Sequence, residues 1–337
     1  MLNKAVIDLF TLKENAKAIK GKLNKGVKFN AVVKADAYGH GASKVANALY
    51  KDVDSFSVAL TEEGITLRNS GIDKEILVLI PPLTCEFENV VFHRLTPAVE
   101  SVESIIALDK ECCRQNKSVN VHVKFNSGMN RAGVDDLKEL NEILMAIKGS
   151  EKVKLGGMFS HFACPQNKKS LNVAQNKFLL ANNLVKGYNN KAICHISASG
   201  GFLSGVQADM VRIGILLYGY KPFKSSLIEV KPIMKVYAPV LKTRHLNAND
   251  VALYGDLKSE KDRDISLVRY GYADGLDRKN TQEIFNNRCM DVSAVNGLFS
   301  GFYPILEDAD VLAKQYGTIS YEILTKVALR AQKIYVT

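Results

Sequence analysis

The chain has 337 residues, of which 47% are hydrophobic and 24% are charged, and this predicts one large domain plus a smaller one with a substantial core. The net charge of +10 is spread among acidic residues without a basic block or an aromatic-basic platform, so we expect no nucleic-acid partner. Six cysteines without CxxC spacing, and the lack of a signal-peptide core or a long apolar run, predict a cytoplasmic chain without a metal site or a membrane partner.

The first two-thirds of the chain alternates between short apolar runs and segments with helical periodicity. A helix is predicted in the N-terminal segment, with Leu12, Ala16, Ile19 and Leu23 on one face. The predicted strands are eight apolar runs: Lys28–Lys34, Ser55–Leu60, Glu75–Ile80, Leu95–Val99, Val119–Phe125, Lys154–His161, Ala192–Ser197 and Asp209–Ile215. Strands that alternate with helices predict parallel βα units, and eight units favour a closed (β/α)8 barrel. This pattern alone leaves an open doubly wound sheet possible, although no GxGxxG motif follows an early run.

The pattern changes after about residue 230. Alternating runs at Met234–Lys242, Ile265–Gly271 and Arg288–Val295 are separated by turn-rich stretches, and we expect one late helix at Ser320–Arg330. The sequence therefore predicts an α/β chain with a barrel domain at 1–230 and a smaller, mainly β domain at 231–337.

Polar residues cluster at the carboxyl ends of the predicted strands, where barrel enzymes carry their active sites. These residues are Lys34, Lys124, Arg131, His161, Ser199, Arg212, Gly214 and Ile215. We expect these side chains, which include one histidine and four cations, to face one opening together with a glycine-rich turn. Such an opening suits the binding of an anionic carbonyl compound that carries a phosphate.

Lys34 follows the apolar residues Ala31, Val32 and Val33. Burial disfavours a charged amine, and a neutral amine is what Schiff-base chemistry requires. The alternative is an ordinary lysine whose amine reaches solvent at a strand end. Local sequence leaves the two readings nearly even, and the glycine-rich turn with Tyr38 that follows favours a ligand site.

A series of motifs in one order resembles the alanine racemase family, whose lysine motif is usually KA(N/D)AYGHG. The motifs are VVKADAYGHG at 32–41, KFNSGMNR at 124–131, FSHFA at 159–163, VRIGILLYG at 211–219, LYG at 253–255, GYADG at 271–275, RCMD at 288–291 and TISYE at 318–322. One such motif would be weak evidence, but this ordered set spans residues 32 to 322 and is specific.

The resemblance implies a fold, a cofactor and an assembly. The fold is a pyridoxal 5'-phosphate (PLP) barrel followed by a β domain, and the assembly is a homodimer in which each β domain completes the partner's active site. The implied activity is interconversion of L- and D-alanine, which supplies D-alanine for peptidoglycan. Lys34 would carry the cofactor as a Schiff base and act as the base for D-alanine. Tyr254 of the partner would be the base for L-alanine.

The resemblance also assigns the binding residues. The cofactor would be held by Lys34, Tyr38, His161, Ser199, Arg212, Gly214, Ile215 and Tyr321. Within this set, Arg212 would face the pyridine nitrogen and His161 would support Arg212. Arg131 and the Met290 backbone would bind the substrate carboxylate. Tyr272 and Asp291 would line the entry, and Lys124, which is sometimes N-carboxylated in this family, would orient Arg131.

Some positions depart from the family pattern, and some alternatives stay open. Asn126 stands where KxDTGM has an aspartate, and Ala198 stands where an asparagine is common. A PLP decarboxylase would place an acid, not Arg212, at the pyridine nitrogen. A non-catalytic PLP-binding protein would lack the β domain with Tyr254 and Met290. A racemase of serine or of larger amino acids is the alternative that the sequence separates least well.

Overall fold

The computed structural model describes residues 2–254, 258–278 and 288–337, which fold into two compact units. One unit contains Lys13–Ala35 and Ala42–Val230, and the other contains Met1–Leu12, Asp36–Gly41 and Lys231–Thr337. The sequence division placed residues 1–12 and 36–41 with the barrel, whereas the structure places them with the β-rich unit. No helix within the described ranges is both long and apolar enough to cross a membrane.

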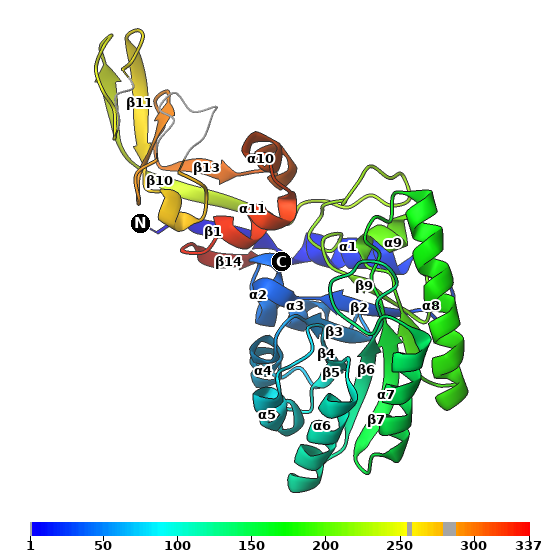
Figure 1. Ribbon diagram of the computed structural model, residues 1–337. Helices are drawn as coiled ribbons and strands as arrows, with labels where there is room; N and C mark the ends of the chain where they lie inside the picture. The colour runs from blue at the N-terminus through cyan, green and yellow to red at the C-terminus, as the bar shows by residue number, and fades with distance from the viewer. Residues whose placement is uncertain (1, 255–257, 279–287) are drawn as a thin grey trace. The chain divides into compact units, whose positions relative to one another are not determined.

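The first unit is the predicted barrel of eight parallel strands (Figure 1). In chain order they are β2 (Lys28–Val32), β3 (Ser55–Val58), β4 (Ile76–Val78), β5 (Thr96–Val99), β6 (Val119–Lys124), β7 (Val153–Phe159), β8 (Ile193–His195) and β9 (Met210–Ile213). Strand β9 pairs with β2 at one end of the order and approaches β8 at the other, where the Arg212 backbone N–H donates to the Ser197 carbonyl over 2.9 Å. Every residue of β3, β4, β5 and β9 is buried, which is typical of parallel strands covered on both faces.

Helices alternate with these strands and lie on the outside of the barrel (Figure 1). They are α1 (Leu9–Lys20), α3 (Ala42–Leu49), α4 (Thr61–Asn69), α5 (Phe87–Phe92), α6 (Val102–Arg114), α7 (Leu137–Gly149), α8 (Lys168–Tyr188) and α9 (Ser199–Leu203), with a 3₁₀ turn at Thr84–Glu86. Three residues of the predicted inner face of α1, Leu12, Ala16 and Ile19, are completely buried, whereas Leu23 lies beyond the end of the helix and is only partly buried. Helices α4, α6, α7, α8 and α9 pack against strands of the barrel.

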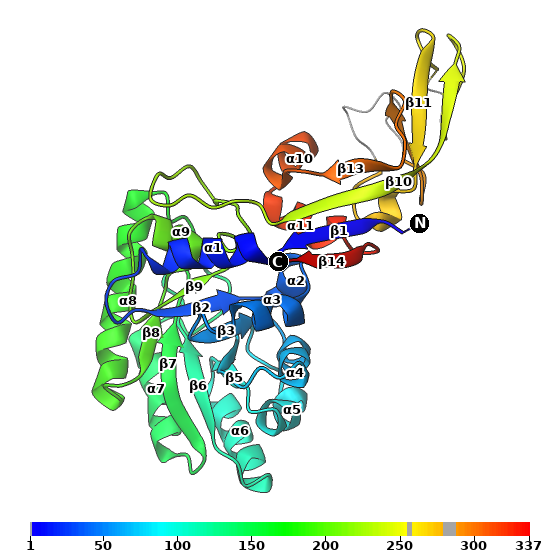
Figure 2. The same ribbon diagram turned by 180° about the vertical axis from the view of Figure 1, so that it is seen from behind.

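The second unit is built on a sheet that the sequence predicted only in part. Its strands are β1 (Lys4–Asp8), β10 (Met234–Leu246), β11 (Arg263–Val268), β12 (Ser293–Asn296), β13 (Phe302–Leu306) and β14 (Gln332–Val336). Strand β1 lies between β10 and β14, antiparallel to the first and parallel to the second. The long strand β10 pairs with β1 and β13 through its first residues and with β11 through its last, so it continues from the sheet into a ribbon (Figure 2).

The expectation of a single late helix is corrected by the structure. Between residues 288 and 337 the structure has two helices, α10 (Ala309–Tyr316) and α11 (Ser320–Val327). Helix α10 is capped at its start by the Asp308 side chain, which accepts from the Asp310 N–H, and it ends at Gly317 with φ of 64°. A short 3₁₀ turn at Tyr272–Asp274 also belongs to this unit.

Candidate active site

Lys34 lies just beyond the carboxyl end of β2, where the sequence predicted it. The preceding Val33 N–H donates to the Ser57 carbonyl over 2.9 Å, so the backbone stays attached to the sheet up to the lysine. Burial lowers the pKa of the Lys34 amine, and the positive charges of Arg131 and Arg212 lower it further, whereas Glu63 opposes them. The barrel thus favours the neutral, nucleophilic form of this amine.

The turn after Lys34 is left-handed, which the sequence did not reveal. Ala35, Asp36, Ala37 and Tyr38, within α2 (Lys34–Tyr38), all have φ between 50° and 54°. Such a conformation costs roughly 1–2 kcal/mol per residue for L-amino acids, so neighbouring contacts must stabilise it. Glu63 supplies one of these contacts, because its Oε1 accepts from the Ala35 N–H over 2.5 Å.

The second unit holds the rest of this turn and explains the GHG sequence. Asp36 pairs with Lys333 over 2.6 Å, and the His40 Nδ1 lies 2.9 Å from the Ala37 and Tyr38 carbonyls. A Cβ on Gly39 would lie 2.3 Å from the Leu324 carbonyl oxygen, and one on Gly41 would lie 2.0 Å from the Tyr335 hydroxyl. Both glycines are therefore required by close packing as well as by their positive φ values of 82° and 94°.

Four cations of the barrel unit lie close enough to interact electrostatically. Arg131, Arg212 and Lys34 all lower the pKa of Lys124, in addition to burial, while Glu100 raises it. The Lys124 Nζ donates to the Leu79 carbonyl over 3.0 Å. Lys34, Lys124, Arg131 and Arg212 are thus brought together as the sequence expected. Their mutual repulsion makes the site suited to binding anions.

Arg212 lies on β9 and is buried, and its guanidinium is held by histidine and backbone acceptors. Its Nη2 donates to the Ser160 carbonyl over 2.7 Å, and its Nη1 donates to the Nδ1 of His195. Burial and the charge of Arg131 lower the pKa of Arg212 to about 9. His161, predicted to support Arg212, has its Nδ1 3.4 Å from the Arg212 Nη2, a longer contact than that of His195.

His195 and His122 extend the contacts of Arg212 through the interior of the barrel and were not singled out from the sequence. A guanidinium can only donate, so the Nδ1 of His195 accepts and its Nε2 carries the proton. That Nε2 lies 2.9 Å from the Nδ1 of His122, which therefore accepts in turn. The Nε2 of His122 lies 3.5 Å from Glu75. Burial and the charge of Arg212 lower the pKa of His122 to about 3 and hold the pKa of His195 well below its ordinary value, so both imidazoles are neutral at neutral pH.

The predicted phosphate-binding residues fall in both units. In the barrel, the Ser199 hydroxyl accepts from the Gly214 N–H over 3.2 Å. Ile215, the residue after Gly214, is buried. In the second unit, the rings of Tyr38 and Tyr321 lie 6.0 Å apart between centroids, and burial raises the pKa of Tyr321 to about 12. Each half of the predicted set is therefore assembled within its own unit.

The remaining predicted residues lie in the second unit. Tyr272 N–H donates to the Cys289 carbonyl over 3.1 Å, and a Cβ on Gly271 would lie 2.1 Å from the Met290 carbonyl oxygen, so the GYADG and RCMD segments are packed together. Asp291 pairs with Arg330 over 2.8 Å. The Tyr254 side chain is 69% exposed in the single chain.

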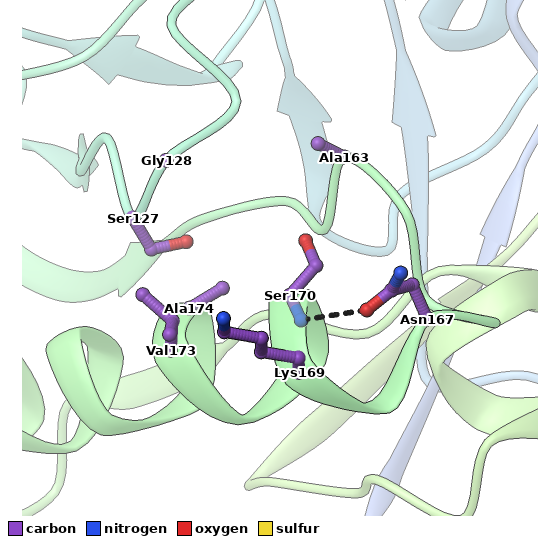
Figure 3. A pocket seen from close by; sticks show the side chains of 8 residues that line it. All are labelled: Ser127, Gly128, Ala163, Asn167, Lys169, Ser170, Val173 and Ala174. Carbon is purple, nitrogen blue, oxygen red and sulfur yellow. Dashed lines mark hydrogen bonds between the residues drawn. The ribbon is translucent and has the colours of Figure 1, made fainter.

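A pocket of about 390 Å³ lies on the barrel unit beside the loop that carries Arg131. Figure 3 shows Ser127 and Gly128 on one side and the start of α8, with Asn167 and Ser170, on the other. The Asn167 side chain caps α8 by accepting from the Ser170 N–H over 3.0 Å. None of the eight residues that line this pocket is a predicted site residue, so the pocket does not contain the cationic cluster.

The depressed pKa of Lys34 has a measurable consequence in the cofactor-free protein. At about pH 8, Lys34 should react with an amine-directed reagent faster than the exposed lysines, because more of it is neutral. Arg131→Gln should slow this labelling and Glu63→Gln should accelerate it, since they remove opposite charges. Peptide mass spectrometry after a short exposure measures both changes, and labelling of Lys34 at the rate of the exposed lysines would contradict the expectation.

These donors fit a phosphorylated aldehyde such as PLP. The lysine amine has a depressed pKa, a buried guanidinium lies on the neighbouring strand β9, and a serine–glycine pair follows strands β8 and β9. In barrels this last position is a common phosphate site. The cluster, in which Lys124 and Arg212 are buried, also carries an excess of positive charge that a phosphate and a carboxylate would neutralise.

Comparisons with known proteins agree with the geometry. The family model described as alanine racemase, N-terminal domain, matches residues 7–222. The alanine racemase of Treponema denticola is 32% identical, over 99% of this chain and 98% of its own length. The solved alanine racemase of Clostridium difficile 630 superposes with a TM-score of 0.94 at 30% identity, covering 100% of this chain and 96% of that one. The Bartonella henselae alanine racemase with covalently bound pyridoxal phosphate has a TM-score of 0.86 at 25% identity, with 100% of both chains covered. The chain belongs to the alanine racemase family, whose members are PLP-dependent amino-acid racemases.

Proposed function

We propose that the chain interconverts L-alanine and D-alanine with two bases, Lys34 and Tyr254, around a PLP cofactor attached to Lys34. The observation that carries this proposal is the amine of Lys34, which burial and the neighbouring arginines hold toward its neutral form. A neutral amine can both attach a carbonyl cofactor and accept a proton.

Racemisation requires a proton to leave one face of the α-carbon and another to arrive on the opposite face. PLP, when bound, acidifies this proton by delocalising the resulting negative charge. The protein must then supply a base on each side. Lys34 is assigned the α-proton of D-alanine. The Tyr254 hydroxyl, which its exposure leaves available, is assigned the α-proton of L-alanine.

Arg212 would face the pyridine nitrogen as a permanent donor. Its Nη1 and Nη2 are already committed to His195 and Ser160, so its plane is fixed before the cofactor arrives. An arginine gives up no proton to the ring, which would keep the cofactor a weaker electron acceptor than an acid at this position would. His161 adds a further contact to the same guanidinium.

The other anionic groups have separate binding residues. Ser199, the Gly214 and Ile215 N–H groups, Tyr38 and Tyr321 are assigned to the phosphate. Arg131 and the Met290 N–H are assigned to the substrate carboxylate, with Lys124 orienting Arg131. Tyr272 and Asp291 would narrow the entry to small side chains such as that of alanine.

The assembly and the biological role belong to the same proposal. We propose a homodimer in which Tyr254 and Met290 act in the partner's site, since these side chains are 69% and 53% exposed in the single chain. We further propose that the protein works in the cytoplasm, where D-alanine would be supplied for peptidoglycan.

The experiment that tests the activity is a racemisation assay with PLP and a panel of alanine, serine, lysine and arginine. We expect D-alanine from L-alanine and much slower conversion of the other amino acids. Comparable rates with serine would support the broader racemase reading. PLP bound without interconversion of any enantiomer would instead identify a non-catalytic cofactor-binding protein.

A further inference from the structure

Asn126 occupies the centre of the loop that carries Arg131. The loop leaves β6 at Lys124 and returns at Val134, where it is closed by two backbone bonds. The Asn126 N–H donates to the Val134 carbonyl over 2.9 Å, and the Val134 N–H donates to the Lys124 carbonyl over 2.9 Å. Glu100 reinforces the closure by accepting from the Gly133 N–H over 2.6 Å. The two ends of the loop are therefore fixed to the barrel.

The Asn126 side chain holds the interior of the same loop with four hydrogen bonds. Its Oδ1 accepts from the Gly128 and Asn130 N–H groups over 3.1 and 3.0 Å. Its Nδ2 donates to the Asn130 Oδ1 over 3.0 Å and to the Asp135 Oδ1 over 2.6 Å. Two backbone donors face the oxygen and a carboxylate faces the nitrogen, so only one orientation of the amide satisfies all partners.

These bonds reach the residue next to Arg131. Asn130 has φ of 55°, a left-handed conformation that asparagine tolerates better than most residues. Asn126 contacts both the backbone and the side chain of Asn130, and so fixes the direction in which the chain enters Arg131. The position of the guanidinium relative to Lys34 and Lys124 then depends on this contact.

The Asn126 amide can donate a hydrogen bond to the Asp135 carboxylate, which an ionised carboxylate at position 126 could not do. An aspartate at position 126 could accept from Gly128 and Asn130 but could donate to Asp135 only when protonated. At neutral pH it would place two negative charges where Asn126 and Asp135 now share a hydrogen bond of 2.6 Å. This gives a chemical reason why the chain departs from the KxDTGM pattern at this position.

We propose that Asn126, paired with Asp135, is a positioning residue that holds Arg131 for the substrate carboxylate. The inference rests on the proposed function, in which Arg131 binds that carboxylate. In this proposal the Asn126–Asp135 pair fixes the position of the residue that binds the substrate carboxylate. Proton transfer is carried out by Lys34 and Tyr254.

The test compares the wild type with Asn126→Asp, Asp135→Asn and the double variant in a double-mutant cycle. For Asn126→Asp, KM for alanine should rise roughly threefold to tenfold over wild type at about pH 9, and the ratio should approach one near pH 5.5, where the pair shares a proton. The value of kcat should change by less than about twofold, because the two bases are untouched. The double variant restores one amide and one carboxylate, so its KM should return to the wild-type value at every pH. Asp135→Asn keeps a side-chain oxygen that can accept from the Asn126 amide, so its KM should rise by less than that of Asn126→Asp at about pH 9.

A second readout needs no racemase activity. Because Arg131 lowers the pKa of Lys34, displacement of Arg131 should slow the labelling of Lys34 in cofactor-free Asn126→Asp at about pH 9. The double variant should restore the labelling rate. An unchanged KM and an unchanged labelling rate in Asn126→Asp, or failure of the double variant to rescue them, would overturn the inference. If the wild-type protein racemises no amino acid, the proposed function fails, and the labelling rates alone then decide whether Asn126 positions Arg131.

Discussion

Replacing Lys34 with alanine is expected to reduce alanine racemisation by at least about 10⁴-fold, because one residue provides both the cofactor attachment and a base. Lys34 is half-buried at the end of β2, where no other described lysine except Lys124 shares the cationic cluster. Lys124 donates to the Leu79 carbonyl over 3.0 Å and is held there by that bond. We therefore expect no substitute amine in the Lys34→Ala variant.

The matched control is Lys28→Ala, at the opposite end of the same strand. Lys28 is exposed, so its removal leaves β2 and the cluster in place. Borohydride reduction of the wild-type and Lys28→Ala holoenzymes should fix the cofactor on the peptide that contains Lys34, and mass spectrometry would locate it. Racemisation by Lys34→Ala at more than about one-hundredth of the wild-type rate would contradict the assigned role.

The barrel could be predicted from the sequence because its strands are buried on both faces. Such strands appear as largely apolar runs, and each of the eight predicted runs overlaps a strand of the barrel. Strand β1 was missed for a physical reason. Its partners β10 and β14 come more than 200 residues later, and an alternating five-residue segment has little local signal without them. Helix α10 is marked in the sequence by the cap residues Asp308 and Gly317, which are signals for the start and the end of a helix.

The sequence predicted those residues of the candidate site that lie at the ends of strands or in the loops that follow them. Lys34, Lys124, Arg131 and Arg212 are brought together by the barrel, as that position implied. The supporting contacts were not predictable, because they join residues from different strands. Glu63 reaches the Ala35 N–H from α4, and His122 and His195 meet between β6 and β8. His195 ends the run of β8, and that position at a strand end was the only sequence signal available.

The two histidines show why pattern alone cannot assign such roles. A histidine within an apolar strand is most often a packed side chain. Here Gly157 allows His122 to lie against β7, since a Cβ at that position would approach its ring to 2.7 Å. The resulting hydrogen-bond chain determines which nitrogen of each ring carries the proton, and this depends on Arg212 acting only as a donor.

Replacing Tyr254 with phenylalanine is expected to lower kcat/KM for L- and D-alanine by the same factor, on the order of 10³, since only one of the two proposed bases is lost. The factor must be equal because the two enantiomers have equal free energies, so the equilibrium constant fixes the ratio of the two rate constants. The loss is nevertheless asymmetric at the level of proton exchange. In deuterated water, Lys34 should still exchange the α-proton of D-alanine, with retention of configuration, while L-alanine exchanges far more slowly.

Proton NMR of the α-position measures this exchange, and chiral chromatography measures racemisation. Tyr237→Phe is the matched control, because it removes one hydroxyl from β10 of the same unit. Tyr254 is 69% exposed, so the loss of its hydroxyl should change the free energy of unfolding by less than about 0.5 kcal/mol. A fall in racemisation at unchanged stability would therefore reflect lost chemistry. Equal loss of exchange for both enantiomers would show that Lys34 cannot exchange the α-proton of D-alanine without Tyr254, and the assignment of one independent base to each face would then be wrong.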